Sequence, residues 1–314
     1  MNGKLSLLKA NIGRRLIGKD ELIDLVLTAL LAGGHLLLED VPGVGKTTLA
    51  GALARSVSCS FSRIQFTPDV TPLDVTGYTM LNMSTGQMEF KPGAVMSQIV
   101  LADEINRTSP KTQSSLLEAM EERQVTVDGE THALPQPFMV MATQNPVEFA
   151  GTYPLPEAQL DRFLLCVTLG YPTVAEEVDI LERYTSSGQP PLTQLQPVCS
   201  AQDILALQAL LPQVYSSPEL RQYIAEIAAA TRRHPSIMLG VSPRGAIALL
   251  KAAQAQALLS GRDYVLPDDV RRLMQPVLSH RLQLTPEARM KAVSPDALLD
   301  ELAAGITVPV KRRL

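Results

Sequence analysis

A glycine-rich turn that ends in Lys46 and Thr47 carries the most distinctive chemistry in this 314-residue chain. Three leucines from Leu36 predict a short buried strand before the turn, and the residues from Thr47 onward predict a helix after it. Glycines in such a turn let backbone N–H groups face a phosphate, and the helix start adds a partial positive charge. Lysine reaches the β and γ oxygens, and threonine can ligate Mg²⁺. The sequence therefore predicts that a nucleoside triphosphate binds at Pro42, Gly43, Val44, Gly45, Lys46, Thr47 and Thr48.

The turn departs from the general phosphate-loop pattern at one position. That pattern begins with glycine, and Asp40 stands in its place. The substitution affects how the chain enters the loop and leaves the Gly-Lys-Thr chemistry intact. Because a Gly-Lys-Thr turn alone also occurs as an ordinary helix start, a second signal is needed.

The second signal is a pair of carboxylates at the end of an apolar strand. Residues 99–102 are apolar and lead directly into Asp103 and Glu104. The first carboxylate of such a pair can hold Mg²⁺ through its water shell, and the second can orient the water that attacks the γ-phosphate. Acidic pairs are common at solvated helix starts, but a position after an apolar strand downstream of Lys46 is specific.

Further polar residues at element ends have two interpretations each. Asn145 follows the apolar strand 138–142, where its amide can bind phosphate or water, although Asn before Pro is also a common turn. Arg162 lies at a strand start, where arginine is usually solvated but can also reach into a neighbouring subunit. Arg244, in the first turn of a helix, is either a surface residue or a phosphate ligand. Ile17 and Gly18 either flank an adenine ring or form a simple turn.

Composition excludes several classes of protein. Apolar residues make up 46% and charged residues 19% of the chain, as expected of a soluble globular protein with a large core. The net charge of −4 argues against broad nucleic-acid binding. The apolar run from Leu22 to Leu38 is interrupted and too short to span a membrane. The N-terminus lacks a signal peptide and the three cysteines are scattered, so we expect a reducing, cytoplasmic location.

The first half of the chain predicts alternating helices and strands. Helices are expected over 5–15, 21–32 and 110–122, and further strands over 61–66 and 163–167. Hairpins are expected over 78–93 and over 124–133, the latter around an Asp-Gly turn. Met80, Met83 and Met88 in the first hairpin are candidates for an adaptable contact surface. Ordinary packing explains each of them more simply.

The sequence changes character after Pro172. Cap signals open successive helices at Ser200, Ser217, Ser242 and Pro267, and the apolar positions repeat at helical spacing. No strand is expected there. We therefore predict an α/β domain over residues 1–171 and a helical domain over residues 172–314.

The ordered set of motifs resembles the AAA+ ATPases, and the residues within each motif are similar to those of the MoxR family. The resemblance covers about residues 16–282. It rests on Leu-Glu-Asp-Val-Pro-Gly-Val-Gly-Lys-Thr-Thr (38–48), Arg-Ile-Gln-Phe-Thr-Pro-Asp (63–69), Asp-Glu-Ile-Asn-Arg (103–107), Ala-Thr-Gln-Asn-Pro (142–146), Leu-Pro-Glu-Ala-Gln-Leu-Asp-Arg-Phe (155–163) and Val-Ser-Pro-Arg (241–244).

The resemblance implies a five-stranded parallel sheet with helices on both faces, followed by a helical lid. It implies that the ligands are ATP and Mg²⁺, and that the first hairpin is an insertion in helix 2. The implied roles are Walker A for Lys46 and Thr47, Walker B for Asp103 and Glu104, sensor 1 for Asn145, arginine finger for Arg162 and sensor 2 for Arg244. Gln65 is a candidate to restrain Glu104 until a partner binds.

The leading hypothesis is an ATP-driven remodelling ATPase that works as a homo-oligomeric ring. The resemblance adds a hexamer and a chaperone-like role in maturing or activating other proteins, commonly ones with von Willebrand factor A domains. Two alternatives stay open: a nucleotide-gated binding module with negligible turnover, and a DNA-dependent motor. The sequence names neither the client nor the pathway.

Overall fold

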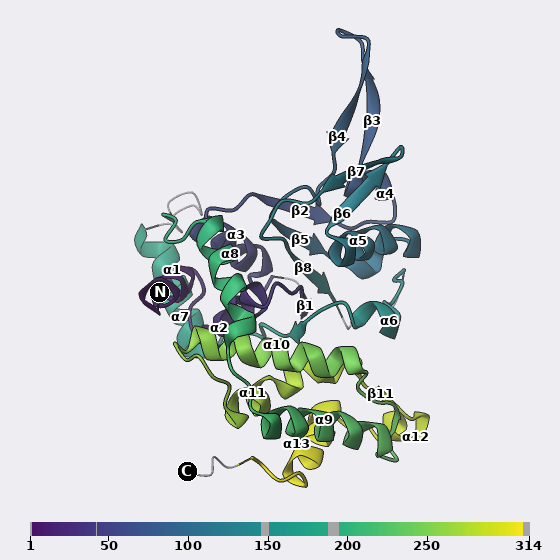
Figure 1. Ribbon diagram of the computed structural model, residues 1–314. Coiled ribbons are helices and arrows are strands. Elements are labelled where there is room, and N and C mark those ends of the chain that lie inside the picture. Colours follow the sequence, from purple (N-terminus) through teal and green to yellow (C-terminus); the bar gives the residue numbers. More distant parts are fainter. Residues whose placement is uncertain (1, 42, 146–150, 188–194, 310–314) are drawn as a thin grey trace.

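A five-stranded parallel sheet forms the centre of the computed structural model, which describes residues 2–41, 43–145, 151–187 and 195–309 (Figure 1). The order of its strands in space is β2, β5, β8, β1, β9. Their bounds are β1 (Leu36–Glu39), β2 (Phe61–Gln65), β5 (Ile99–Asp103), β8 (Met139–Gln144) and β9 (Leu165–Val167). The sheet confirms the predicted α/β core.

The strand order places the polar strand ends together. All adjacent pairs of this sheet are parallel, so every strand ends at the same edge. The phosphate loop follows β1, the acidic pair begins at the last residue of β5, and Asn145 follows β8. Because ligands of open α/β sheets bind outside the carboxyl ends of the strands, this edge is the expected position of a site.

Alternate side chains of the inner strands enter two separate cores. On one face, Leu36 and Leu38 of β1 pack with Leu101 and Met141 and with the helices α1 (Asn2–Gly13), α2 (Asp20–Leu31) and α3 (Lys46–Ser56). On the other face, Leu37 packs with helices α4 (Pro72–Thr76) and α5 (Pro110–Glu122). Such burial on both faces is typical of parallel sheets and explains the apolar runs.

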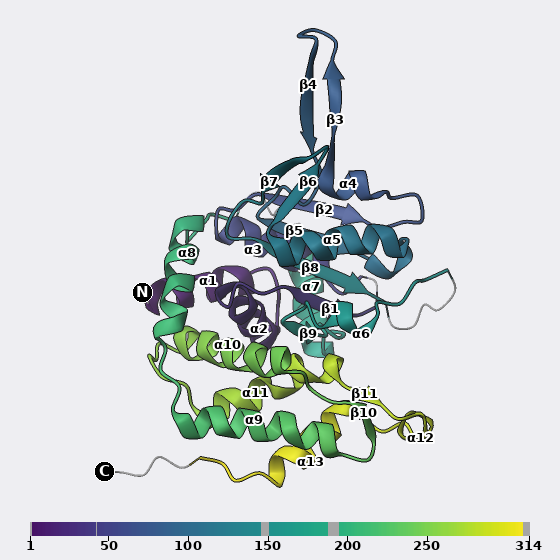
Figure 2. The ribbon, with the colours of Figure 1, turned by 45° about the vertical axis from the view of Figure 1, so that its right-hand side comes forward.

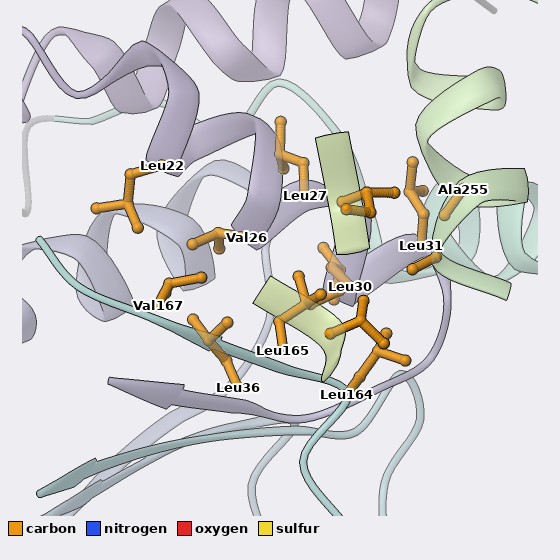
Figure 3. Packing of buried hydrophobic residues seen from close by; sticks show 14 of the residues in the cluster. Leu22, Val26, Leu27, Leu30, Leu31, Leu36, Leu164, Leu165, Val167 and Ala255 are labelled. Carbon is orange, nitrogen blue, oxygen red and sulfur yellow. The ribbon is translucent and has the colours of Figure 1, made fainter. Parts of the chain in front are cut away.

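The C-terminal helices form a layer beneath the sheet and α2 (Figures 1 and 2). Figure 3 shows α2 side chains, Leu27 and Leu31 among them, lying between strands β1 and β9 and Ala255 of α10. One apolar cluster therefore continues from the α/β core into this layer. Its helices are α9 (Pro218–Arg233), α10 (Pro243–Leu259), α11 (Pro267–Leu278), α12 (Pro286–Met290) and α13 (Pro295–Ala304).

The predicted caps are confirmed, but the prediction of a strand-free C-terminal part is wrong. Ser217 and Ser242 accept hydrogen bonds from the backbone N–H groups of Leu220 and Gly245. Between the helices, β10 (Ile237–Leu239) pairs antiparallel with β11 (Gln283–Leu284). These strands are too short to show a period-2 pattern, and they pair across more than forty residues, so only tertiary packing reveals them.

Helices α7 (Val174–Ser187) and α8 (Ala201–Leu210) connect the two parts. Helix α8 packs on the N-terminal helices: Lys4 forms an ion pair with Asp203 at 2.8 Å, and Gln208 donates to the carbonyl of Leu30. Because α8 follows residue 171 in the chain but packs on the N-terminal helices, the predicted domain boundary after residue 171 stays a prediction. Within the described ranges, no helix is long and apolar enough to cross a membrane.

Two hairpins stand out from the sheet (Figures 1 and 2). The long one consists of β3 (Gly77–Asn82) and β4 (Gln87–Pro92), and the short one of β6 (Gln124–Val127) and β7 (Glu130–Ala133). Phe90 and His132 stack across them, with ring centroids 3.9 Å apart. The preference for ordinary packing of the methionines is wrong, because Met80, Met83 and Met88 are all exposed.

A buried histidine ties β1 to its neighbours. The imidazole of His35 accepts the N–H of Val140 at Nδ1 (3.0 Å), so Nε2 carries the proton and donates to the carbonyl of Met120 (3.1 Å). Burial, helped by the charge of Arg123, lowers the pKa of His35 to about 3. The neutral ring is therefore part of the native structure.

We expect the free energy of unfolding to fall as the pH drops below about 6.5, because His35 then binds a proton in the unfolded chain but not in the native protein. Each such histidine contributes a slope of about 1.4 kcal/mol per pH unit between the two pKa values. The measurement is urea unfolding from pH 7.5 to 5.5 for the natural chain and for His35→Gln. Equal pH slopes in the two proteins would contradict the assignment.

Candidate functional site

The phosphate loop has the backbone that its glycines permit. Gly43 and Gly45 have φ angles of +88° and +101°, values that side chains disfavour, and open space lies where their Cβ atoms would be. Lys46 begins α3, and its Nζ lies 3.0 Å from the carbonyl oxygen of Asp40. Val44 packs against the core, Thr47 and Thr48 occupy the first turn of α3, and Pro42 lies outside the described residues.

Asp40 holds the start of this loop. Its buried carboxylate accepts the backbone N–H groups of Leu169 and Gly170, which follow β9. Lys19 donates to the carbonyl of Leu169 from the other side at 2.8 Å. The residue that departs from the general pattern thus connects the phosphate loop to the end of the sheet and to the turn after α1.

The same connection brings Ile17 and Gly18 toward the loop. Gly18 has a φ of +69°, and the carboxylate of Glu176 in α7 fills the place of a Cβ atom there. Thr173 holds that carboxylate with hydrogen bonds that lower the pKa of Glu176. The turn lies between Lys19 and α7, and its role beside an adenine ring stays a prediction.

Hydrogen bonds hold both carboxylates of the acidic pair. Asp103 accepts the hydroxyl of Thr143 at Oδ1 (2.6 Å) and pairs with Arg63 at Oδ2 (2.6 Å). Glu104 accepts the amide of Gln65 at 2.7 Å and pairs with Arg107 at 3.2 Å, both at Oε2. The structure therefore brings together Gln65 and Glu104, as the sequence suggested.

Glu104 has an unusual backbone conformation. Its φ and ψ are 57° and 50°, a left-handed conformation that costs a residue other than glycine about 1 kcal/mol or more. Thr143 supports it, because the hydroxyl oxygen that donates to Asp103 also accepts the N–H of Glu104 at 2.8 Å. Asn145 lies two residues beyond, directly after β8. One buried threonine therefore holds the carboxylate of Asp103 and the backbone of Glu104, and it neighbours the predicted sensor.

The donor set fits Mg²⁺. A hydroxyl from Thr47 and a carboxylate from Asp103 are hard oxygen ligands; Thr47 lies in the first turn of α3, after the loop that follows β1, and Asp103 ends β5 at the same edge of the sheet. The two loop glycines leave room for phosphate beside them.

Arg162 and Arg244 lie elsewhere, at the amino-terminal edge of the sheet. The carboxylate of Glu121 binds both, at 3.1 Å from Arg162 Nη2 and 2.5 Å from Arg244 Nη2. They line a cavity of about 230 Å³ that also includes Gly34 and His35, the residues just before β1. Arg244 therefore does not project toward the phosphate loop of its own chain, which follows the other end of β1.

A buried arginine fixes the segment that carries Arg162. Arg281, at the end of η4 (Ser279–Arg281), donates to the carboxylate of Asp161 at 2.7 Å and to the carbonyl of Phe163 at 2.7 Å. Burial lowers the pKa of Arg281, and the contact with Asp161 opposes that shift. The helical layer thus positions Arg162 against the sheet.

Sequence reasoning missed five of these residues. Thr143 could have been noticed as a hydroxyl at the end of an apolar strand, beside Gln144 and Asn145. Arg63, Glu121 and Arg281 gain their roles from contacts between distant segments, whereas Arg107 pairs with Glu104 three residues before it.

Comparison with known proteins agrees with this geometry. Residues 35–165 match the model of the ATPase family associated with various cellular activities (AAA), and residues 229–302 match an AAA lid domain. A crystal structure of a Cytophaga hutchinsonii ATCC 33406 protein superposes with a TM-score of 0.91 at 37% identity, over 98% of this chain and 96% of that one. The sheet, the phosphate loop and the helical lid thus define an AAA+ P-loop ATPase.

Two relatives narrow the family. Chaperone MoxR1 of Mycobacterium tuberculosis is 40% identical over 95% of this chain and 80% of its own length. The uncharacterized protein YeaC of Bacillus subtilis is 55% identical over 96% of this chain and 94% of its own length. The chain belongs to the MoxR family.

Replacing Thr143 by valine tests its double hydrogen bond. The variant keeps the shape of the side chain but leaves the N–H of Glu104 without that acceptor, which we expect to lower the free energy of unfolding by about 1–3 kcal/mol. ATP turnover should fall with it because the carboxylate of Asp103 and the backbone of Glu104 each lose a hydrogen bond. Thr126→Val on the exposed short hairpin is the matched control. Equal effects of the two substitutions would contradict the role of Thr143.

Proposed function

We propose that this chain is a Mg²⁺- and ATP-dependent remodelling ATPase that works as a ring, most simply a hexamer, and matures or activates partner proteins. The observation that carries the proposal is the meeting of the phosphate loop, the acidic pair and Asn145 at one edge of the sheet. The set is the machinery of hydrolysis and not of binding alone.

Each residue has a distinct role in the proposed reaction. The backbone of the loop and Lys46 bind the phosphates, and Thr47 and Asp103 would hold Mg²⁺, which neutralises charge on the β and γ phosphates. Glu104 orients and polarises the attacking water. Asn145 binds the γ-phosphate or that water. Gln65 holds Glu104 away from the water until the site is completed, which its 2.7 Å contact supports.

The position of the arginines supports a ring. Each chain carries a phosphate loop at one edge of its sheet and Arg162 with Arg244 at the opposite edge. The two edges are different surfaces, so contact between them is head-to-tail, and such contacts close into rings when the rotation allows. We infer that the arginines of one subunit stabilise the triphosphate bound by the next.

The charge of the arginine cavity supports the same role. Five cationic side chains line it: Arg123, Arg162, Arg244, Lys251 and Arg281. Two carboxylates, Glu121 and Asp161, oppose them, so the described lining keeps an excess of positive charge. Such a surface attracts the γ-phosphate of a neighbouring copy, and an arginine finger of this kind contributes about 10³- to 10⁵-fold to the rate.

The long hairpin favours protein clients over DNA. It exposes five large hydrophobic side chains and a single cation, Lys91: the hydrophobic ones are Tyr78, Met80, Leu81, Met83 and Met88. Methionine-rich surfaces adapt to varied protein partners, whereas nucleic acid requires cations. A relative is named a chaperone, and we extend that role to this chain. Proteins with von Willebrand factor A domains are the proposed clients, and the three free cysteines suit a cytoplasmic setting.

The substitution Glu104→Gln tests hydrolysis. The amide keeps the size of the side chain but cannot polarise water, so we expect ATP binding to persist and turnover to fall at least about 100-fold. Phosphate release and binding of a fluorescent ATP analogue measure the two effects. Turnover at the natural rate would remove Glu104 from the mechanism, and absence of turnover in the natural chain would favour a nucleotide-gated binding module.

A mixing experiment tests the shared site. Arg162→Ala subunits and Glu104→Gln subunits should each be inactive in pure rings. Mixed rings should regain part of the activity, because an intact Glu104 then meets an intact Arg162 from its neighbour. Rings mixed with a subunit that carries both substitutions are the control and should stay inactive. Complete absence of rescue would show that Arg162 acts within its own chain.

A further inference from the structure

A single guanidinium nitrogen of Arg63 contacts both Asp103 and the glutamine that holds Glu104. This nitrogen, Nη2, lies 2.6 Å from Oδ2 of Asp103 and 2.8 Å from Oε1 of Gln65. The register of β2 and β5 explains the contact, because Gln65 pairs with Asp103, and Arg63 lies two residues back on the same side of the strand. The side chain thus faces the acidic pair from the edge strand of the sheet.

Arg63 holds the oxygen end of the Gln65 amide. A guanidinium only donates hydrogen bonds and a carboxylate only accepts them, so the amide oxygen faces Arg63 and the amide nitrogen faces Glu104, to which it donates at 2.7 Å. The two neighbours therefore require the same orientation. Without Arg63 the amide is held at its nitrogen end alone, and its restraint on Glu104 is weaker.

Arg63 binds the oxygen of Asp103 that Thr143 does not bind. Thr143 donates to Oδ1, and Arg63 occupies Oδ2. A carboxylate oxygen that accepts from a guanidinium binds a second cation, or the water shell of one, less well. The carboxylate is largely buried, with 12% of the side chain exposed, which limits its room to serve both.

We propose that Arg63 is a positioning residue that competes with Mg²⁺ for Asp103 and links that competition to the restraint of Glu104 by Gln65. The proposal rests on the proposed function. Arg63 would leave Asp103 when that carboxylate holds Mg²⁺ beside bound nucleotide. The amide oxygen of Gln65 would then lose its donor, and Glu104, less firmly restrained, would be free to activate water. The catalytic carboxylate is thus kept inactive until the metal site is filled.

The test compares the Mg²⁺ dependence of nucleotide binding in Arg63→Met and in the natural chain. Methionine keeps the length of the side chain and removes its charge. At a fixed concentration of fluorescent ADP, the Mg²⁺ concentration for half-maximal binding should fall about two- to fivefold, the range expected for loss of a half-exposed ion pair. Basal ATP turnover should rise as well, because Glu104 is less restrained.

Two other substitutions separate the steps. Gln65→Met should raise basal turnover without shifting the Mg²⁺ dependence, because it frees Glu104 but leaves Arg63 on Asp103. Arg272→Gln is the matched control: its ion pair with Asp24 has 41% and 14% of the two side chains exposed, against 45% and 12% for Arg63 and Asp103. That control should match the natural chain in both measurements.

An unchanged or raised Mg²⁺ requirement in Arg63→Met would overturn the proposal, as would an equal shift in Arg272→Gln. If Arg63→Met does not fold, Arg63→Gln takes its place with the same expected result. The binding assay uses ADP, so it gives an answer even if the natural chain fails to hydrolyse ATP. Failure of hydrolysis would instead reject the proposed function.

Discussion

The parallel direction of the five central strands is the constraint on which the rest of the structure depends. It gathers every carboxyl end at one edge, where the phosphate loop, the acidic pair and Asn145 meet. It also places the segment before β9, which includes Arg162, at the amino-terminal edge of the sheet. A chain built this way carries the phosphate loop and the arginine pair on opposite surfaces, and the proposed reaction would use a second copy to bring them together.

The carboxylates of the site are held by neighbours that have opposite effects. Thr143 binds the carboxylate of Asp103 and supports the left-handed backbone of Glu104, which stores strain where a reaction would need the group to move. Arg63 and Gln65 bind the same two side chains from the edge strand and restrain them. The buried hydroxyl of Thr143 fixes the geometry of the site, whereas the contacts from the half-exposed strand β2 can be released.

The helical lid does more than cover the core. Arg281, at the end of η4, donates to the carboxylate of Asp161 and to the carbonyl of Phe163, and η4 thereby sets the position of Arg162. Burying a guanidinium this deeply is costly unless it is fully paired, and carbonyl groups complete its bonds. A movement of the lid would therefore move Arg162.

The sequence alone determined the features that depend on neighbouring residues. The backbone freedom of glycine predicted the phosphate loop, an apolar run before Asp103 predicted the acidic strand end, and serine caps predicted the helices of the lid. Tertiary structure decided what depends on distant segments: the contact of Arg63 with Asp103, the pairing of β10 with β11, the exposure of the hairpin methionines, and the meeting of Arg162 and Arg244 on Glu121. The physical reason is that local patterns record backbone preference and burial, whereas the partner of a charged side chain is set by how the folded elements pack.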